Sequence, residues 1–240
     1  MKSFRAVQLY STLKMKTLIL LFTWLLMYPL SLSAQSANDL LQKVAEALSA
    51  DKDDYAVSLF RQAADAGVDQ TEMFYWTRMN KGSEVTPRLA QVLATHYKEL
   101  RNYDKAYLFY KEFLQRYPED VPALVSCAEM EMMRGKEKDA VKTYEKVLKL
   151  DSDNLQANIF LGNYYYLQAE IEKKKIEEDY KKITSPTKMQ YARYRNGLSD
   201  VFTNNYSKAK VYLQRVLQLF PSTEAGKTLE KIRKMESEKR

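Results

Sequence analysis

The sequence predicts an all-α protein: a superhelix of stacked helical hairpins with one long inserted helical hairpin and a C-terminal capping helix. Three observations predict this fold class. First, apolar and small positions recur every 34 residues, as in Leu93, Cys127 and Leu161. Second, the 240 residues include only six glycines and six prolines, which is few for a protein of strands and tight turns. Third, residues 163–185 contain neither glycine nor proline and pair acids with bases four residues apart, which favours one long exposed helix.

The N-terminal residues 1–34 have the pattern of a secretory signal peptide. Lys14 and Lys16 precede a short apolar run over residues 18–27, and small residues follow it up to Ala34. We therefore expect cleavage after Ala34 and a periplasmic or secreted protein of the Gram-negative bacterial envelope. An uncleaved anchor is the alternative, and contact with the membrane is expected only in that case.

A second possible start lies within this segment. Met15 begins a complete signal pattern of its own, so residues 1–14 are a candidate start-site artefact.

The central part of the chain carries three copies of one motif. Residues 87–120, 121–154 and 155–169 hold, in turn, Leu93-Ala94-x-x-Tyr97 with Ala106-x-x-x-Tyr110, Cys127-Ala128 with Ala140-x-x-x-Tyr144, and Leu161-Gly162-x-x-Tyr165. These residues resemble the tetratricopeptide repeat family, whose 34-residue repeat consists of two antiparallel helices. The second copy departs from the family pattern, with Glu131 in place of the usual aromatic residue and Ser152 in place of the usual proline. Because no single hairpin buries its apolar face alone, the resemblance implies stacking of neighbouring hairpins.

The third copy is interrupted by a helical insert over residues 170–205. We expect one continuous helix over 155–183, an end at Ser185-Pro186, and a return helix over about 187–203. A turn at Thr203-Asn204-Asn205 then leads into the second helix of the repeat, which ends at Pro221. The alternative is an additional degenerate hairpin with a turn near Ala169.

Two further segments flank the repeats, which extend over 87–223. Residues 35–86 read as a degenerate repeat over 37–66 followed by a short helix over about 71–80. Residues 224–240 belong to an amphipathic terminal helix with a charged outer face, as a capping helix requires.

No catalytic or cofactor-binding pattern stands out, so we expect a protein that is not an enzyme and needs no cofactor. His96 is the single histidine of the chain, which excludes any metal site that needs two imidazoles, and we expect no metal. Cys127 occupies a core position of its repeat, where a cysteine acts as a small hydrophobic residue. After removal of residues 1–34 the net charge is only +3, which gives no support for nucleic acid as a partner.

The resemblance implies that the first helix of each hairpin lines a concave face where a protein partner binds. The residues on that face would be Gln91, Thr95, Lys98, Val125, Glu129, Met132, Ile159, Asn163 and Tyr166. Their mixture of apolar and polar side chains suits a peptide or helix with apolar anchors. We therefore expect a protein–protein interaction scaffold that recruits a partner peptide or helix. A structural subunit that docks permanently in a larger envelope complex is the alternative.

Overall fold

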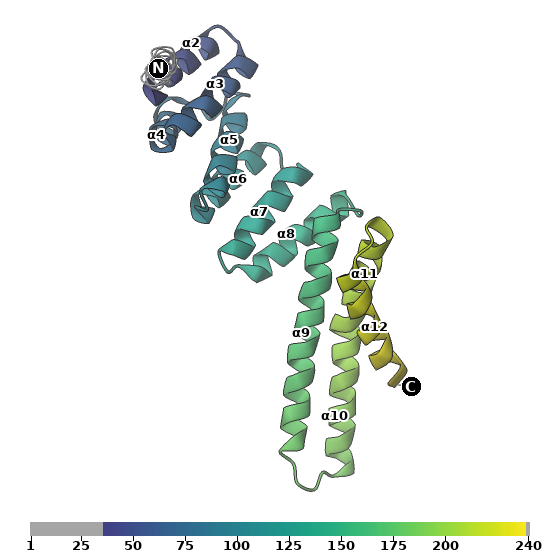
Figure 1. Ribbon diagram of the computed structural model, residues 1–240. Helices are drawn as coiled ribbons and strands as arrows, with labels where there is room; N and C mark the ends of the chain where they lie inside the picture. Colours follow the sequence, from purple (N-terminus) through teal and green to yellow (C-terminus); the bar gives the residue numbers. More distant parts are fainter. Residues whose placement is uncertain (1–35, 239–240) are drawn as a thin grey trace, which may run out of the picture. The chain divides into compact units, whose positions relative to one another are not determined.

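The structure is a computed structural model that describes residues 36–238, and all regular elements in this part of the chain are helices (Figure 1). The all-α prediction is thereby confirmed. The predicted signal segment 1–34 lies outside the described residues. Within the described part, no helix combines the length and apolar content needed to cross a membrane. The chain forms two compact units, divided between Thr71 and Glu72.

The first unit contains the degenerate N-terminal hairpin, made of α2 (Ala37–Ser49) and α3 (Asp53–Ala66). The hydroxyl of Ser36 accepts a hydrogen bond from the backbone N–H of Asp39 and so caps α2. The two helices bury an apolar strip against each other, which contains Leu40, Leu41, Val44, Ala56, Phe60 and Ala63. This is the pattern that the sequence predicted for residues 37–66.

Helix α4 (Val68–Arg78) begins in the first unit and continues into the second. We expected the short helix to group with the N-terminal segment up to residue 86, but its second half packs on the repeats instead. Tyr75 is buried and lies edge-to-face on Phe109, with 5.5 Å between ring centroids. Glu72 accepts hydrogen bonds from Tyr97 and, at 2.6 Å, from Lys105. Burial alone would raise the pKa of Glu72, but these hydrogen bonds outweigh that effect. The pKa is therefore lowered overall, and the carboxylate stays charged.

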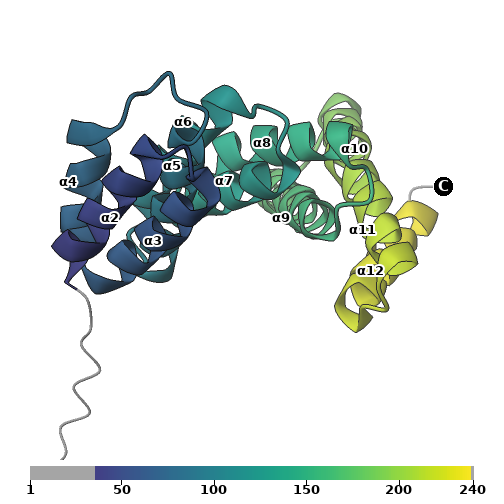
Figure 2. The ribbon, with the colours of Figure 1, turned by 90° about the horizontal axis from the view of Figure 1, so that it is seen from above.

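The second unit continues with two regular repeats. Helices α5 (Thr86–Glu99) and α6 (Tyr103–Arg116) form the first, and α7 (Val121–Met133) and α8 (Glu137–Leu150) the second. The small residues of the repeat motif are fully buried where the helices approach: Ala94, Ala106, Ala128 and Ala140. Each of these helices packs mainly on its neighbours in the chain, and Figure 2 shows α6, α7, α8 and α9 following one another in that order.

The insert begins within α9 (Leu155–Lys181), which runs without interruption through Ala169. This confirms the continuous helix and excludes a turn near Ala169. Helix α10 (Lys188–Val201) returns beside it in the opposite direction (Figure 1). Thr187 and Gln190 form a capping box at its start, because each side chain accepts a hydrogen bond from the backbone N–H of the other residue.

The expected turn at Thr203-Asn204-Asn205 was wrong. A π-helical segment, η1 (Phe202–Tyr206), joins α10 directly to α11 (Ser207–Leu219). A π-helical turn takes up one additional residue without breaking the helix. Contacts to α9 hold the segment in this form: the hydroxyl of Tyr206 donates to Glu170 at 2.5 Å, and the amide of Asn205 donates to Glu172 at 2.9 Å.

Helix α11 completes the third repeat against α9, and α12 (Thr223–Glu238) covers α11. Tyr165 of α9 stacks on Tyr212 of α11 with 6.0 Å between ring centroids. Apolar residues of α9, α10, η1, α11 and α12 form one core, which contains Ala169, Val201, Tyr206, Ala209, Leu213, Val216, Ala225, Leu229 and Ile232. The terminal helix is therefore the cap that the sequence predicted.

Candidate partner-binding groove

A groove of about 730 Å³ extends from the C-terminal ends of α5 and α7 along one face of α9. We call it the α9 groove. Its lining consists of Lys98, Glu99, Arg101, Tyr103, Glu129, Met130, Met132, Met133, Glu137, Tyr144, Gln156, Ile159, Phe160, Asn163, Tyr164, Leu167, Gln168 and Ile171. The side chains therefore come from both regular repeats and from the long helix of the insert.

Aromatic rings line the middle of the α9 groove. Phe160 packs on Tyr144 with 4.6 Å between ring centroids, and on Tyr164 at 6.1 Å. Tyr144 is buried, and burial raises its pKa to about 12, so its hydroxyl stays protonated at neutral pH. These packed rings give the groove a rigid apolar surface.

Large aliphatic side chains at the sides of the groove are open to solvent. Met133 is 62% exposed, Leu167 57% and Ile171 61%. Apolar side chains that gather in a concave surface and remain exposed are typical of binding sites for other molecules.

The end of the groove near α5 is polar, and two of its charges are paired with each other. Lys98 of α5 forms a salt bridge with Glu129 of α7, and Gln156 of α9 donates a hydrogen bond to the same carboxylate. Three successive first helices are thereby linked through Glu129. This cluster shapes the end of the groove, while the apolar surface lies beyond it on α9.

The structure brings together five of the nine residues that the sequence assigned to the concave face. They are Lys98, Glu129, Met132, Ile159 and Asn163. The other four, Gln91, Thr95, Val125 and Tyr166, do not line the α9 groove. Thr95 instead donates its hydroxyl hydrogen bond to the carbonyl of Gln91, one turn earlier in α5.

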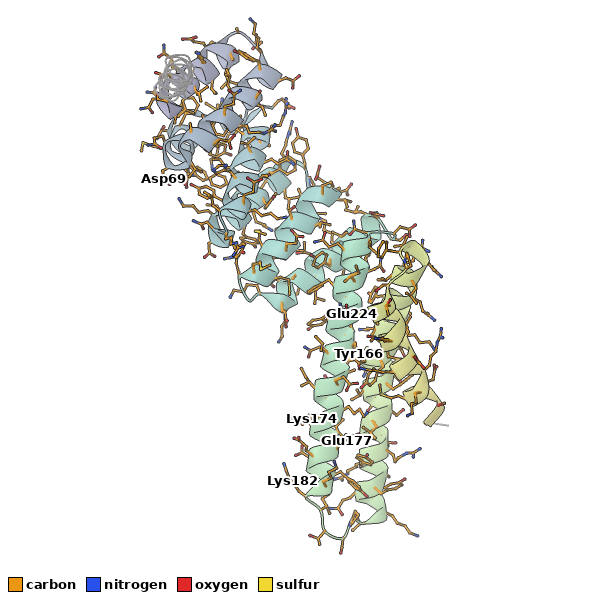
Figure 3. The ribbon with its side chains drawn as sticks, viewed as in Figure 1. Asp69, Tyr166, Lys174, Glu177, Lys182 and Glu224 are labelled. Carbon is orange, nitrogen blue, oxygen red and sulfur yellow. The ribbon has the colours of Figure 1, made fainter. Side chains whose placement is uncertain are left out.

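Tyr166 lies on another side of α9. Its ring meets Tyr206 edge-to-face at 6.0 Å, next to the core shared by α11 and α12 (Figure 3). Successive residues of a helix are about 100° apart around its axis. Leu167 and Ile171 therefore lie to one side of Ile159 on α9, and Tyr166 lies to the other side.

The sequence-based list omitted the residues that carry most of the exposed apolar surface on α9. Leu167 and Ile171 continue the spacing of four residues that begins with Ile159 and Asn163. That spacing, once α9 is known to be continuous, identifies them as members of the same face.

Cys127 and His96, the two residues considered above for catalysis or metal binding, both lie within the packed helices. Cys127 is buried, and burial raises the pKa of its thiol to about 12, which keeps it protonated and unreactive. His96 is half-buried on α5. Within residues 36–238, no group of three or more His, Cys, Asp or Glu side chains is arranged to hold a metal ion.

Comparison with known proteins agrees with this fold. The sequence profile described as "Tetratricopeptide repeat" matches residues 93–120. The chain is similar to a candidate protein-binding protein from Bacteroides ovatus ATCC 8483, whose crystal structure is known. The two share 59% identity with a TM-score of 0.76, over 86% of this chain and 100% of the other.

Two more distant structures were also found. The MamA protein has 16% identity and a TM-score of 0.36, over 64% of this chain and 84% of its own. A thermophilic TPR protein from Thermus thermophilus has 13% identity and a TM-score of 0.31, over 81% of this chain and 99% of its own. These two scores are too low to bear on the details of the fold. No curated protein matches the sequence.

Proposed function

Because the chain belongs to the tetratricopeptide repeat family, we propose that it is an interaction scaffold of the bacterial envelope that holds a peptide or helix of a partner protein in the α9 groove. The repeats and the Bacteroides ovatus relative support a role in protein–protein interaction and a scaffold rather than an enzyme. The observation that carries the finer proposal is the exposed apolar surface of Leu167, Ile171 and Met133 in the groove. A partner that covers these side chains removes apolar area from water, which favours association.

The binding site is tested by photo-crosslinking in the bacterial envelope. A photoreactive amino acid at Leu167 is expected to give a discrete crosslinked partner. The matched control is the same amino acid at Val211 of α11, which is 63% exposed but lies outside the groove. Ile159→Glu should abolish the adduct at Leu167, because a charge would then be buried against apolar groups of the partner. Equal adducts at both positions, or none at Leu167, would contradict the proposal.

The envelope location is supported by the signal pattern of residues 1–34. N-terminal sequencing of the protein purified from cells tests it. We expect a mature chain that begins near Gln35. A chain that begins at residue 1 or 15 would contradict export with cleavage.

A second candidate function is a structural subunit that docks permanently through the α9–α10 hairpin. The observation in its favour is the apolar surface near the end of the hairpin, where Met189 is 65% and Tyr191 49% exposed. Stoichiometric co-purification that survives high salt and is lost in Met189→Ser/Tyr191→Ser would support it. A partner that dissociates readily, and whose binding is unchanged by these two substitutions, would contradict it.

A further inference from the structure

The face of α9 that lines the groove continues toward the end of the hairpin and changes from apolar to basic. Successive helical residues are about 100° apart around the axis. Five residues of the next turns of α9 therefore lie on the same face as Leu167 and Ile171, within about a third of the helix circumference. These five are Lys174, Lys175, Glu178, Lys181 and Lys182. All of them are exposed, and we call them the lysine stripe.

Three acids of this part of α9 have contacts outside the groove face. Glu170 accepts from Tyr206 and Glu172 accepts from Asn205, both in η1. Glu177 lines a separate cavity together with Tyr191 and Tyr194 of α10. Figure 3 shows Glu177 nearer to α10 than Lys174. These three acids are therefore engaged outside the groove face, whereas Glu178 and Asp179 pair with lysines of the stripe.

The ion pairs within reach of the lysine stripe leave it positive. Lys174 and Glu178 are 3.8 Å apart and mostly exposed, and Lys182 lies 2.8 Å from the exposed Asp179. Exposed pairs of this kind contribute about 0–1 kcal/mol and exchange partners readily. Four lysines with one glutamate on this face form a basic surface that begins where the apolar surface ends.

We infer that the partner segment is an amphipathic helix that lies along α9, with its apolar side on Ile159, Leu167 and Ile171 and with acidic residues over the lysine stripe. This inference rests on the proposed function of the groove. A helix fits because the lysine stripe follows Leu167 and Ile171 on the same third of α9, over about 23 Å from Leu167 to Lys182. Nucleic acid fits less well, because the apolar half of the surface offers phosphates no partner.

A displayed library of helices about 24 residues long tests the inference. Leucines are fixed on one side of each helix, and Glu, Lys and Ser are randomised at the flanking positions along its whole length. The purified protein is the first bait. The second bait is Lys174→Glu/Lys175→Glu/Lys181→Glu/Lys182→Glu, whose fold is checked by circular dichroism, and a Lys→Gln version of the same four sites provides a milder change.

We expect helices selected on the unaltered protein to be enriched in Glu toward one end. Their affinity should fall about 10-fold or more for the charge-reversed bait, less for the Gln version, and also with rising salt. A third bait, Leu167→Glu/Ile171→Glu, should bind none of them.

The two proposals fail in different ways. If selected helices need Leu167 and Ile171 but show no preference for Glu, the present inference is overturned and the groove proposal stands. If no selected helix depends on Leu167 and Ile171, both are overturned. Selection of helices rich in Lys instead of Glu would also overturn the inference, because the lysine stripe would repel them.

Discussion

At the scale of single residues, Gly162 decides how closely α9 and α11 approach each other. A Cβ atom at this position would lie 2.8 Å from Cδ2 and 2.9 Å from Cγ of Leu213, which is itself buried. Real side chains do not tolerate such distances without movement. The repeat motif places a small residue here for this reason.

We predict that Gly162→Val lowers the free energy of unfolding by about 2–3 kcal/mol, because the added atoms overpack the contact with Leu213. Urea denaturation followed by circular dichroism measures this change. The matched control is Gly226→Ala in α12, where a Cβ would meet nothing within 4 Å. That substitution should stabilise the protein by about 0.4–1 kcal/mol. A Gly162→Val variant as stable as the unaltered protein would show that the two helices can separate freely.

Glu131 is a second residue with a measurable consequence, since it is buried where the repeat motif has an aromatic ring. Burial raises the pKa of its carboxyl, and the hydrogen bond from Thr143 at 2.7 Å offsets only part of this effect. A carboxyl with a raised pKa in the folded state binds its proton more tightly there. Its contribution to stability is therefore largest below the ordinary pKa of 4.5 and is lost as the pH rises through the folded pKa.

We predict that Glu131→Gln raises the melting temperature at pH 7 by about 2–4 °C, because it removes a buried charge and keeps an acceptor for Thr143. The gain should shrink as the pH falls toward 4. Thermal melts between pH 4 and 8 measure it. Glu119→Gln, at an exposed position between α6 and α7, should show no such trend. A gain that is independent of pH would contradict this account of Glu131.

At the scale of elements, the π-helical segment η1 sets the rotation between α10 and α11. Val201 before it, Tyr206 at its end and Ala209 after it are all buried in the core next to α9. The additional residue of the π-helical turn keeps these side chains on one side. If one residue were removed, α11 would rotate by about 100° relative to α10.

We predict that deletion of Asn204 destabilises the protein by about 3 kcal/mol or more, because Ala209, Leu213 and Val216 would then turn away from α9. Asn204 itself is exposed, so the substitution Asn204→Ala should change stability by about 0.5 kcal/mol or less. Denaturation curves of both variants provide the measurement. Similar stability of the two variants would mean that the π-helical turn has no role in the register.

The same segment shows where prediction from sequence ends. Thr203, Asn204 and Asn205 are residues that favour turns, and a turn was the natural expectation. The hydrogen bonds from Tyr206 to Glu170 and from Asn205 to Glu172 join residues more than 30 positions apart. Local propensity cannot anticipate such contacts, whereas the absence of breakers in α9 was local and predicted that helix correctly.

The α9–α10 hairpin should also be less stable than the repeats. No residue between Glu170 and Asp200 is fully buried, whereas α8 buries Ala140, Val141, Tyr144 and Val147. We predict that amide hydrogens of residues 172–183 exchange faster than those of residues 140–148, because local opening there loses fewer apolar contacts. Hydrogen exchange with mass spectrometry tests this. Equal protection of the two segments would contradict it.

At the scale of the whole molecule, the repeat period explains which of the expected concave-face residues line the α9 groove and which do not. Gln91, Val125 and Ile159 are equivalent by the spacing of 34 residues, and so are Lys98, Met132 and Tyr166. Equivalent positions face the same surface only where successive helices pack against equivalent neighbours. Helix α9 pairs with a helix that follows a long insert, and Tyr166 meets Tyr206, directly after that insert, instead of lining the groove.

The chain of contacts from α5 to α12 runs mainly between neighbours, since α5 packs with α6, α6 with α7, α7 with α8, α8 with α9, α9 with α11 and α11 with α12. In such an arrangement the effect of a substitution is expected to decay along the array. Ile232 of α12 is fully buried at the end of this series. We predict that Ile232→Ala costs about 2–4 kcal/mol and that the loss appears as faster hydrogen exchange in α11, α12 and the part of α9 around Ala169.

Helices α5 and α6 should keep their protection in this variant, because α7 and α8 separate them from α9 and none of their core side chains belongs to the cluster that contains Ile232. The matched substitution is Leu89→Ala, which removes a fully buried side chain from α5 at the other end of the series. It should reverse the pattern, with faster exchange in α5 and α6 and unchanged protection around Leu213. If instead either substitution lowered protection equally in all helices from α5 to α12, the second unit would unfold as one cooperative body, and occupation of the α9 groove would then stabilise the α11–α12 core as strongly as the repeats themselves.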